Sequence, residues 1–149
     1  MAPVKNDETI RDLRRRAIED AMEYLKDSEE FRERMKGALH RSDWKGACFN
    51  AHQCAQLAVK ALLLGKLGRF KYVHLIDELL KDYKAKGGEV PENILSRARR
   101  LNVHYIAPRY FEMRRRVGIA YDERIAQEAV GIAEAILCFA RRELRWTKK

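Results

Sequence analysis

The sequence has no apolar run of the roughly 20 residues that a membrane-spanning helix needs. Residues 1–16 also lack the apolar stretch of a secretory signal peptide. Both absences predict a cytoplasmic protein that does not associate with a membrane. The cysteines Cys48, Cys54 and Cys138 are an odd number and lie among apolar residues. This pattern predicts buried, reduced thiols and excludes a disulfide scaffold.

The common motifs for cofactors and metals are also missing. The eight glycines are scattered, so the chain has neither a phosphate-binding glycine loop nor a dinucleotide-binding fingerprint. The histidines are far apart, and no cysteine or carboxylate stands at ligand spacing beside them; they are His40, His52, His74 and His104. We therefore predict no metal site and no cofactor.

Positive charge, by contrast, is in excess. The chain has 31 Lys and Arg against 22 Asp and Glu, a formal net charge of +9. Such an excess favours an anionic partner, namely a nucleic acid, a nucleotide or an acidic protein. Charged residues make up 36% of the chain, however, and the ion-paired surface of a thermophile's protein would have the same composition. Composition alone leaves both interpretations open.

The spacing of apolar residues is helical nearly throughout, and no segment alternates with period two for long enough to form a strand. We predict a single all-α domain over residues 1–149, with a core of about 8–146, folded as an antiparallel bundle of about five helices. Residues 109–120 are expected to form a loop. The first expected helix covers Glu8 to about Asp27, with a bent extension over Phe31–Leu39. The second begins at Ser42 or Asp43 and runs to about Leu64, with a stop at Gly65. The remaining helices are expected over Tyr72–Lys84, from Pro91 to about Tyr105, and after a cap at Asp122.

One segment is unusually rich in arginine. Between Arg97 and Arg116 there are seven arginines and a single acidic residue, Glu112. Tyrosines are interleaved among them. Guanidinium groups present forked donors to phosphate oxygens, and aromatic rings stack on bases. The pattern predicts an RNA- or nucleotide-binding surface formed by Arg97, Arg100, Tyr105, Arg109, Tyr110 and Arg114.

The same segment contains a candidate catalytic pair, Arg99 and His104. They stand five positions apart, which places them about 140° apart around an ideal helix. We expect the helix to loosen before Pro108, so that the imidazole can turn toward the guanidinium. An imidazole can transfer a proton near neutral pH, and a fixed guanidinium can stabilise charge on a phosphoryl group. Alternatively, His104 is a hydrogen-bonded residue at a helix end and the arginines form a solvated face.

Three segments resemble elements of HEPN domains. Residues 50–63 (NAHQCAQLAVKALL) are similar to the second-helix signature of that family, in which an acid stands where Gln56 lies here. Residues 74–80 resemble the start of the next helix, and residues 105–110 resemble a Tyr-x-x-x-Arg-Tyr element after the fourth helix. They stand in family order within residues 10–144. The resemblance implies a dimeric five-helix bundle, often encoded beside a minimal nucleotidyltransferase.

The resemblance also implies two alternative functions. Many HEPN proteins are metal-independent ribonucleases or toxins of toxin–antitoxin systems, with an Arg, four to six residues, and a His at a dimer cleft. Arg99 and Arg97 both stand at matching distances before His104. However, Arg100 follows Arg99 where nuclease members have Asn, Asp or His, and Tyr105 is adjacent to His104 instead of two residues beyond it. The alternative is a non-catalytic subunit that binds a nucleotide or a partner protein, with the nucleotide at Arg109 and Tyr110.

Overall fold

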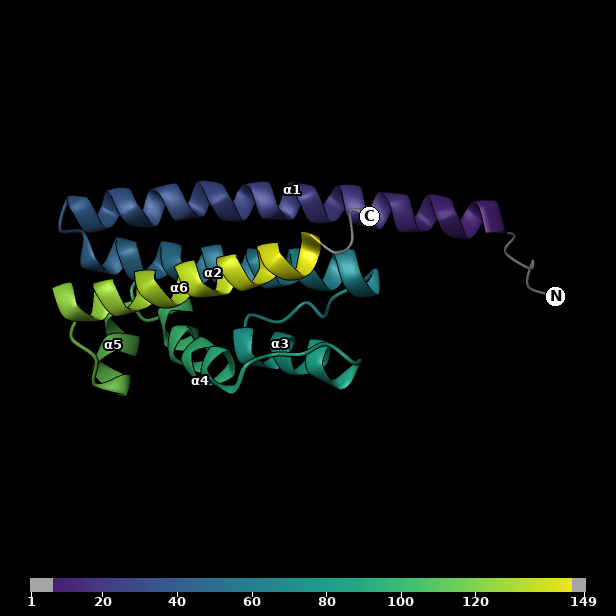
Figure 1. Ribbon diagram of the computed structural model, residues 1–149. Helices are drawn as coiled ribbons and strands as arrows, with labels where there is room; N and C mark the ends of the chain where they lie inside the picture. Colours follow the sequence, from purple (N-terminus) through teal and green to yellow (C-terminus); the bar gives the residue numbers. More distant parts are fainter. Residues whose placement is uncertain (1–6, 146–149) are drawn as a thin grey trace.

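The computed structural model describes residues 7–145, and this range contains helices and turns but no strand. The all-helical prediction is therefore confirmed. None of the helices in this range is long and apolar enough to cross a membrane. The elements are α1 (Asp7–His40), α2 (Trp44–Leu67), α3 (Ile76–Ala85), α4 (Glu92–Leu101), the 3-10 turn η1 (Asn102–Tyr105), α5 (Phe111–Val117) and α6 (Glu123–Arg145) (Figure 1).

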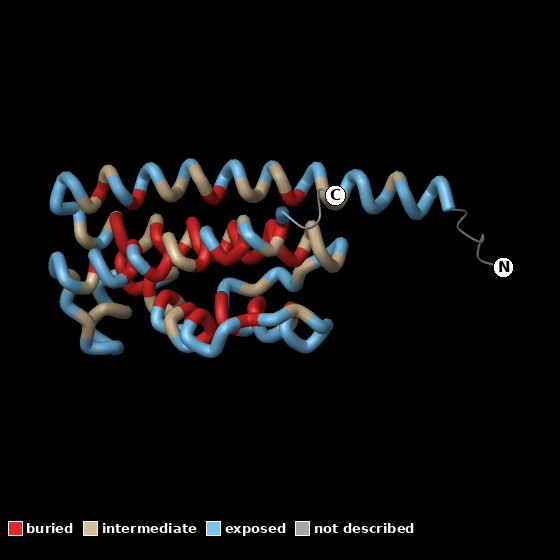
Figure 2. The backbone as a smooth tube through the Cα atoms, viewed as in Figure 1, coloured by how far each residue is buried: buried red, intermediate tan, exposed pale blue. Residues whose placement is uncertain are grey.

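Helix α2 is the centre of the bundle. It packs against α1 on one side and α6 on another, while α3, α4 and η1 lie against its remaining face. Helices α1 and α2 are antiparallel, as are α3 and α4, whereas α6 runs in the same direction as α2 (Figure 1). Small residues let the neighbouring helices approach α2 closely, and Figure 2 shows the buried backbone concentrated there. The fully buried alanines of α2 are Ala47, Ala51, Ala55, Ala58 and Ala61.

Polar side chains fix the starts of two long helices. Asp43 accepts a hydrogen bond from the backbone N–H of Gly46 at 3.0 Å, and Asp122 accepts one from Ile125 at 2.9 Å. The predicted cap at Asp122 is confirmed, and of the two alternatives predicted for α2, Ser42 and Asp43, the structure shows Asp43. The predicted stop at Gly65 is wrong, because α2 continues to Leu67 and ends at Gly68. Gly68 has φ +76°, the left-handed conformation that closes a helix and favours glycine.

Three other boundaries differ from the prediction. Helix α1 is continuous through residues 31–39, because Met35 and Ala38 are fully buried and keep the helical stripe in register with α2. Helix α3 begins at Ile76 and not at Tyr72, since the side chain of Asn102 accepts a hydrogen bond from the Ile76 N–H at 2.9 Å. Helix α4 ends at Leu101, and the backbone tightens into η1 before Pro108.

Residues 109–120, predicted to be a loop, contain α5. This short helix follows Pro108 and ends where Gly118 takes φ +71°. Met and Arg residues within it are good helix formers, so the local sequence supports the helix once its ends are defined by proline and glycine.

The cysteines differ in burial. Cys48 and Cys54 are fully buried, as predicted, and burial raises the pKa of the Cys48 thiol to about 12 and that of Cys54 to about 11. Cys138 is a free thiol on the exposed face of α6, so the prediction of burial is wrong for this residue. The buried apolar stripe of α6 instead includes Leu137 and Phe139, the residues directly before and after Cys138.

Candidate functional site

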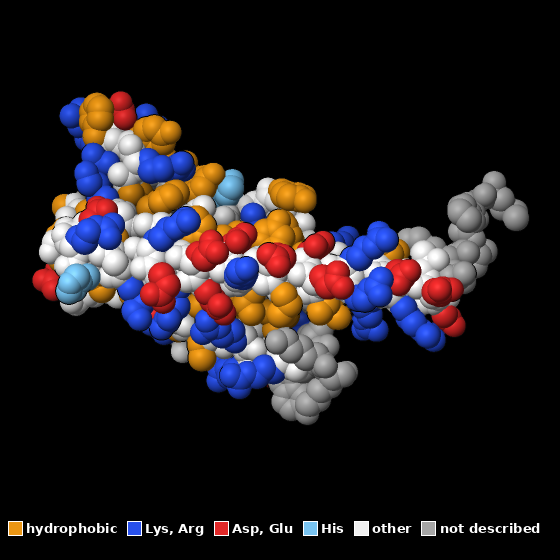
Figure 3. All heavy atoms as spheres, turned by 90° about the horizontal axis from the view of Figure 1, so that it is seen from above, with side chains coloured by type: hydrophobic (Ala, Val, Ile, Leu, Met, Phe, Trp, Pro, Cys, Tyr) orange, Lys and Arg blue, Asp and Glu red, His pale blue; other side chains and the backbone are white. Residues whose placement is uncertain are grey.

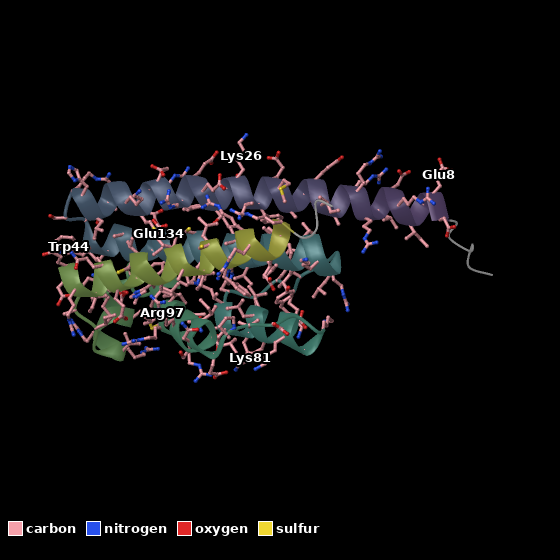
Figure 4. The ribbon with its side chains drawn as sticks, viewed as in Figure 1. Glu8, Lys26, Trp44, Lys81, Arg97 and Glu134 are labelled. Atoms are coloured by element: carbon pink, nitrogen blue, oxygen red, sulfur yellow. The ribbon has the colours of Figure 1, made fainter. Side chains whose placement is uncertain are left out.

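The arginines of α4 are bound to carboxylates of neighbouring helices. The Nε of Arg99 donates to Asp77 of α3 at 3.3 Å, and the Nη2 of Arg100 lies 3.4 Å from Glu128 of α6. Arg97, labelled in Figure 4, lies on the same helix and is half-buried. Two of the three predicted phosphate-binding or catalytic arginines on α4 therefore tie this helix to the bundle.

Asp77 joins α3 to α4 and η1. The residue is 5% exposed. Its carboxylate accepts a 2.7 Å hydrogen bond from the Asn102 side-chain amide and the bond from Arg99, and it lies 3.7 Å from Lys81. Burial by itself would raise the pKa of Asp77, but the hydrogen bonds from Asn102 and Arg99 outweigh it and lower the pKa. Arg99 thus stabilises a buried protein charge.

His104, the predicted catalytic histidine, lies inside the bundle. The residue is 5% exposed, and its Nδ1 is 2.8 Å from the Tyr121 hydroxyl. Burial lowers the pKa of His104 to about 4, so the imidazole is neutral at pH 7. Within residues 7–145, no hydrogen bond or ring contact joins His104 to Arg99. The expected turn of the imidazole toward the guanidinium is absent from this structure.

Arg109 has a different environment. Its guanidinium carbon lies 4.9 Å from the ring centre of Phe49, 4.8 Å from that of Tyr105 and 5.7 Å from that of Tyr110. Its Nε donates to the backbone carbonyl of Tyr105 at 3.0 Å. The residue is exposed, and no carboxylate between residues 7 and 145 forms an ion pair with it. Three rings and one hydrogen bond therefore orient the guanidinium of an exposed residue.

Tyr105 forms the inner wall of this arrangement. The His74 ring stacks on it with centres 4.0 Å apart and an angle of 17°, and the His52 ring lies 5.3 Å away. Gln56 supports His74, since its Nε2 is 2.8 Å from His74 Nδ1. With these neighbours around it, Tyr105 positions Arg109. Tyr110, 54% exposed, is the ring of the predicted pair that can accept a base.

The histidines beside Tyr105 favour their neutral forms. Burial lowers the pKa of His52, although hydrogen bonds with the Gln53 side chain and the His74 carbonyl act in the opposite direction. Burial also lowers the pKa of His74, and the positive charges of Lys60 and Arg109 lower it further. Neither histidine therefore adds a strong positive charge to the surroundings of Arg109 at neutral pH.

Sequence reasoning missed Phe49 and His74 as parts of this site. Phe49 comes from the first half of α2, and His74 comes from the loop between α2 and α3. Their family-like context was visible, because residues 74–80 and the segment beginning at Asn50 resemble HEPN elements. Only the fold shows that Phe49 meets Arg109 and that His74 stacks on Tyr105.

Arg114, also predicted to bind phosphate, holds the chain before α5. Its Nη1 donates to the backbone carbonyls of Ala107 and Pro108, both at 3.1 Å. The guanidinium thereby satisfies two acceptors in a turn and keeps Arg109 in place relative to α5. Arg115 and Arg116 on the same helix are exposed.

An apolar groove of about 520 Å³ lies beside the Arg109 site. Large apolar side chains are exposed around it, and the lobe at the left of Figure 3, which carries α5, shows apolar and basic side chains together. Among residues 7–145, no group of three or more His, Cys, Asp or Glu side chains is placed to hold a metal ion. The apolar lining of the groove comprises Val73, Leu75, Val103, Ile106, Met113 and Val117.

Residues 21–143 match the family model of the HEPN domain. The chain belongs to the HEPN domain family. TT1696 from Thermus thermophilus is similar in structure, with a TM-score of 0.74 and 31% identity over 83% of this chain and 98% of that one. ST0689, an archaeal HEPN homologue, has a TM-score of 0.66 and 29% identity over 83% of this chain and 97% of its own.

A third solved structure, an HEPN domain protein (TM0613) from Thermotoga maritima, shares the fold. It has a TM-score of 0.66 and 24% identity over 83% of this chain and 98% of that one. A search of curated proteins finds no match. The predicted membership of the HEPN family, based on residues 50–63, 74–80 and 105–110, is confirmed.

Proposed function

We propose that this HEPN protein is a non-catalytic subunit that binds a nucleotide, with a phosphate on Arg109 and the base on Tyr110. The observation that carries the proposal is the guanidinium of Arg109, oriented by three aromatic rings and not paired with a carboxylate of residues 7–145. A fixed guanidinium loses little conformational entropy when it binds, and its fork matches phosphate oxygens.

Tyr110 supplies the second half of the ligand site. Its ring is exposed and its centre lies 5.7 Å from the guanidinium carbon of Arg109. A base stacked on such a ring is stabilised by roughly 1–3 kcal/mol, without selection for one base. Phosphate and base are therefore recognised by adjacent groups, which is the combination that a nucleotide presents.

The surroundings of His104 give less support to RNA cleavage. An acid–base catalyst must reach the proton that it transfers, and this imidazole is buried against Tyr121. Arg99, the second member of the expected pair, is engaged by Asp77. A nuclease mechanism would require both side chains to leave these contacts.

The binding test uses fluorescently labelled ATP and fluorescence anisotropy with the full chain. Arg109→Ala is expected to weaken binding about tenfold or more, equivalent to about 1.4 kcal/mol, and Arg109→Lys should recover only part of it because the fork is lost. Arg34→Ala is the matched control, since Arg34 also lies over an aromatic ring, Phe31, at 4.6 Å on α1. Equal affinity of wild type and Arg109→Ala would refute the proposed site.

A cleavage assay tests the non-catalytic part of the proposal. Wild type and His104→Ala are incubated with single-stranded RNA in EDTA, and both are expected to leave the RNA intact. Cleavage by wild type that disappears in His104→Ala would overturn the non-catalytic assignment and restore the nuclease interpretation of Arg99 and His104.

A second candidate function is the binding of a partner protein, favoured by the exposed apolar groove. Helix α5, which contributes Met113 and Val117 to the groove, is basic, with Arg115 and Arg116 exposed and one acidic residue, Glu112. The groove therefore suits a partner that presents apolar side chains flanked by carboxylates. A minimal nucleotidyltransferase, as in the two-component or toxin–antitoxin systems that the family resemblance implies, is the probe. Its complex should weaken with salt and with Val117→Asp, whereas salt-independent binding would exclude this partner chemistry.

A further inference from the structure

Lys60 carries a positive charge inside the bundle. The residue is 9% exposed, and burial lowers the pKa of its ammonium group. Within residues 7–145 this group has no ion pair and no hydrogen bond, and its Nζ lies 5.3 Å from the centre of the Phe70 ring. Because a buried charge without a counter-ion costs free energy, Lys60 favours an anion that these residues do not supply.

Lys60 shares one face of α2 with Phe49 and Gln56. These residues stand seven and four positions apart, which places all three within about 40° around an ideal helix. The segment 68–75, which connects α2 to α3, runs back along α2 (Figure 1). Each of the three side chains contacts a residue that covers this face. The contacts are Phe49 with Arg109, Gln56 with His74, and Lys60 with Phe70.

His74 lies between Arg109 and Lys60 in this row. Its ring stacks on Tyr105 with centres 4.0 Å apart, and the guanidinium carbon of Arg109 is 4.8 Å from the centre of the same Tyr105 ring. Burial lowers the pKa of His74, and the positive charges of Lys60 and Arg109 lower it further, so the imidazole lies within the field of both cations. A ligand that extends from Arg109 toward Lys60 therefore passes His74.

Gln56 determines which nitrogen of His74 carries the proton. Its Nε2 donates to the backbone carbonyl of Val73 at 3.4 Å and lies 2.8 Å from His74 Nδ1. Because an amide nitrogen only donates, Nδ1 is the acceptor and the neutral imidazole carries its proton on Nε2. This Nε2–H has no hydrogen-bond partner within residues 7–145, and His74 is exposed. The imidazole is therefore a neutral donor that a ligand can reach.

Gln56 also leaves the charge of Lys60 uncompensated. It stands four positions before Lys60, where an acidic side chain would form an ion pair with the ammonium group. Its amide is neutral, and the residue is only 3% exposed. One side chain thus keeps His74 a donor and leaves Lys60 available to an external anion.

We propose that His74 and Lys60 form a second phosphate site and that the ligand is a nucleoside polyphosphate. This inference rests on the proposed nucleotide site, with the first phosphate on Arg109 and the base on Tyr110. The following phosphates extend along α2, where the Nε2–H of His74 donates to one and the ammonium group of Lys60 pairs with the last. The side chain of Phe70, in the non-helical segment 68–75, moves aside to admit this terminal phosphate.

The burial of Lys60 favours a nucleotide over single-stranded RNA. A terminal phosphate can enter a nearly closed site end-on, whereas the backbone of a nucleic acid has to continue past each phosphate that it places. With Lys60 only 9% exposed, the row ends at this residue. A monophosphate on Arg109 does not reach Lys60, so the number of phosphates should determine the affinity.

Isothermal titration calorimetry of AMP and ATP with the full chain tests the second site. The buffer contains EDTA, so that no metal ion neutralises the phosphates. Wild type is expected to bind ATP about tenfold or more tightly than AMP. Lys60→Met keeps an apolar side chain over Phe70 but removes the charge, so its ATP affinity should fall to within about threefold of its AMP affinity, which itself stays unchanged. Lys71→Met, which removes an exposed charge from segment 68–75, is the matched control and should retain the preference for ATP.

Gln56→Glu tests the same site with Lys60 in place. The new carboxylate pairs with the ammonium group and accepts a proton from His74 Nδ1, so both groups lose their capacity to bind the outer phosphates. The preference for ATP should therefore disappear, while circular dichroism shows the helical content of wild type. This variant also decides the question if Lys60→Met does not fold.

Arg109→Ala separates failure of this inference from failure of the proposed function. It should weaken AMP and ATP by about the same factor. If it does so but wild type binds AMP and ATP equally, the second site is wrong and the Arg109 site stands. A preference for ATP that persists in Gln56→Glu also overturns the second site. Affinities unchanged by Arg109→Ala would instead refute the proposed function, and with it the phosphate row that begins at Arg109.

Discussion

Arg109 and the arginines of α4 belong to one arginine-rich segment but have opposite electrostatic environments. Arg99 and Arg100 are paired with Asp77 and Glu128, so their charges stabilise the packing of α4. Arg109 is surrounded by aromatic rings and pairs with no carboxylate in residues 7–145. The difference shows that the number of arginines in a segment does not measure its capacity to bind phosphate. The partners of each guanidinium decide it.

This contrast predicts that changes within the α4–η1 region alter stability, whereas changes at Arg109 alter binding. The largest expected effect concerns His104 and pH. Its folded pKa of about 4 is below the ordinary 6.5, so the unfolded chain takes up a proton first as pH falls. Stability should be fully present above pH 6.5 and decrease toward pH 4 by on the order of 3 kcal/mol from this residue.

Urea unfolding at several pH values measures the effect of His104. His52 and His74, whose pKa values are also lowered, contribute in the same direction, so the comparison of wild type with His104→Gln isolates the share of His104. The variant should lose a smaller part of its stability between pH 6.5 and 4. Equal losses in both proteins would show that His104 is not buried in its neutral form.

Asp77→Ala is expected to have the next largest effect. It removes the acceptor for the Asn102 amide and the Arg99 guanidinium and leaves partly buried donors without a partner, at a cost of roughly 1–3 kcal/mol of unfolding free energy. Chemical denaturation at pH 7 gives the value, and labelled-ATP affinity should remain within a factor of about two. A loss of ATP affinity in the folded variant would assign a ligand-binding role to the Asp77 region.

The lowered pKa of Asp77 also has a consequence in acid. Its stabilising contribution is present above the ordinary pKa of 3.8 and is lost as pH falls through the lower folded value. The difference in unfolding free energy between wild type and Asp77→Ala should therefore shrink below about pH 3.8. A difference that stays constant down to pH 2 would contradict a charged Asp77 in the folded protein.

Comparison of Arg109→Ala with Arg99→Ala tests the contrast within one residue type. Arg109→Ala should weaken labelled-ATP binding about tenfold or more, equivalent to about 1.4 kcal/mol, while the unfolding free energy changes little. Arg99→Ala should show the reverse, with reduced stability and near-normal affinity. If both variants lose affinity equally, binding depends on total positive charge and not on the environment of Arg109.

The smallest expected effect is that of Arg100→Ala. Its ion pair with Glu128 is exposed to solvent on both sides, so it contributes about 0.5 kcal/mol or less, and salt should reduce that further. Denaturant unfolding at low and high salt provides the measurement. A loss above about 1.5 kcal/mol would show that Arg100 has a larger role in holding α4 to α6 than an exposed pair supports.

Most of the fold could be predicted from the sequence because long helices carry their own periodicity. The caps at Asp43 and Asp122 and the family-like segments were visible as local patterns. The start of α3 was not, because Asn102, distant in the sequence, supplies the partner for the Ile76 N–H. Cys138 was assigned to the core since it stands among apolar residues, although the helix places it on the opposite face.

The candidate site was only partly predictable for a related reason. Arg109 and Tyr110 were identified from residue type, but their environment depends on Phe49 and His74, which other segments supply. Arg99 and His104 had suitable chemistry and spacing, yet helix geometry already separated them by about 140° around the axis. Asp77 and Tyr121 then fixed each in a different place.

The most direct test of the contrast between arginines is an NMR titration that follows the Nε–Hε signals of arginine side chains as unlabelled ATP is added. Arg109→Lys and Arg99→Lys assign the two signals. A phosphate on Arg109 should shift its Nε–Hε signal in a saturable way, while the Arg99 signal, held by Asp77, stays in place. Shifts at Arg99 with none at Arg109 would contradict the proposed role of Arg109 and place the nucleotide on α4.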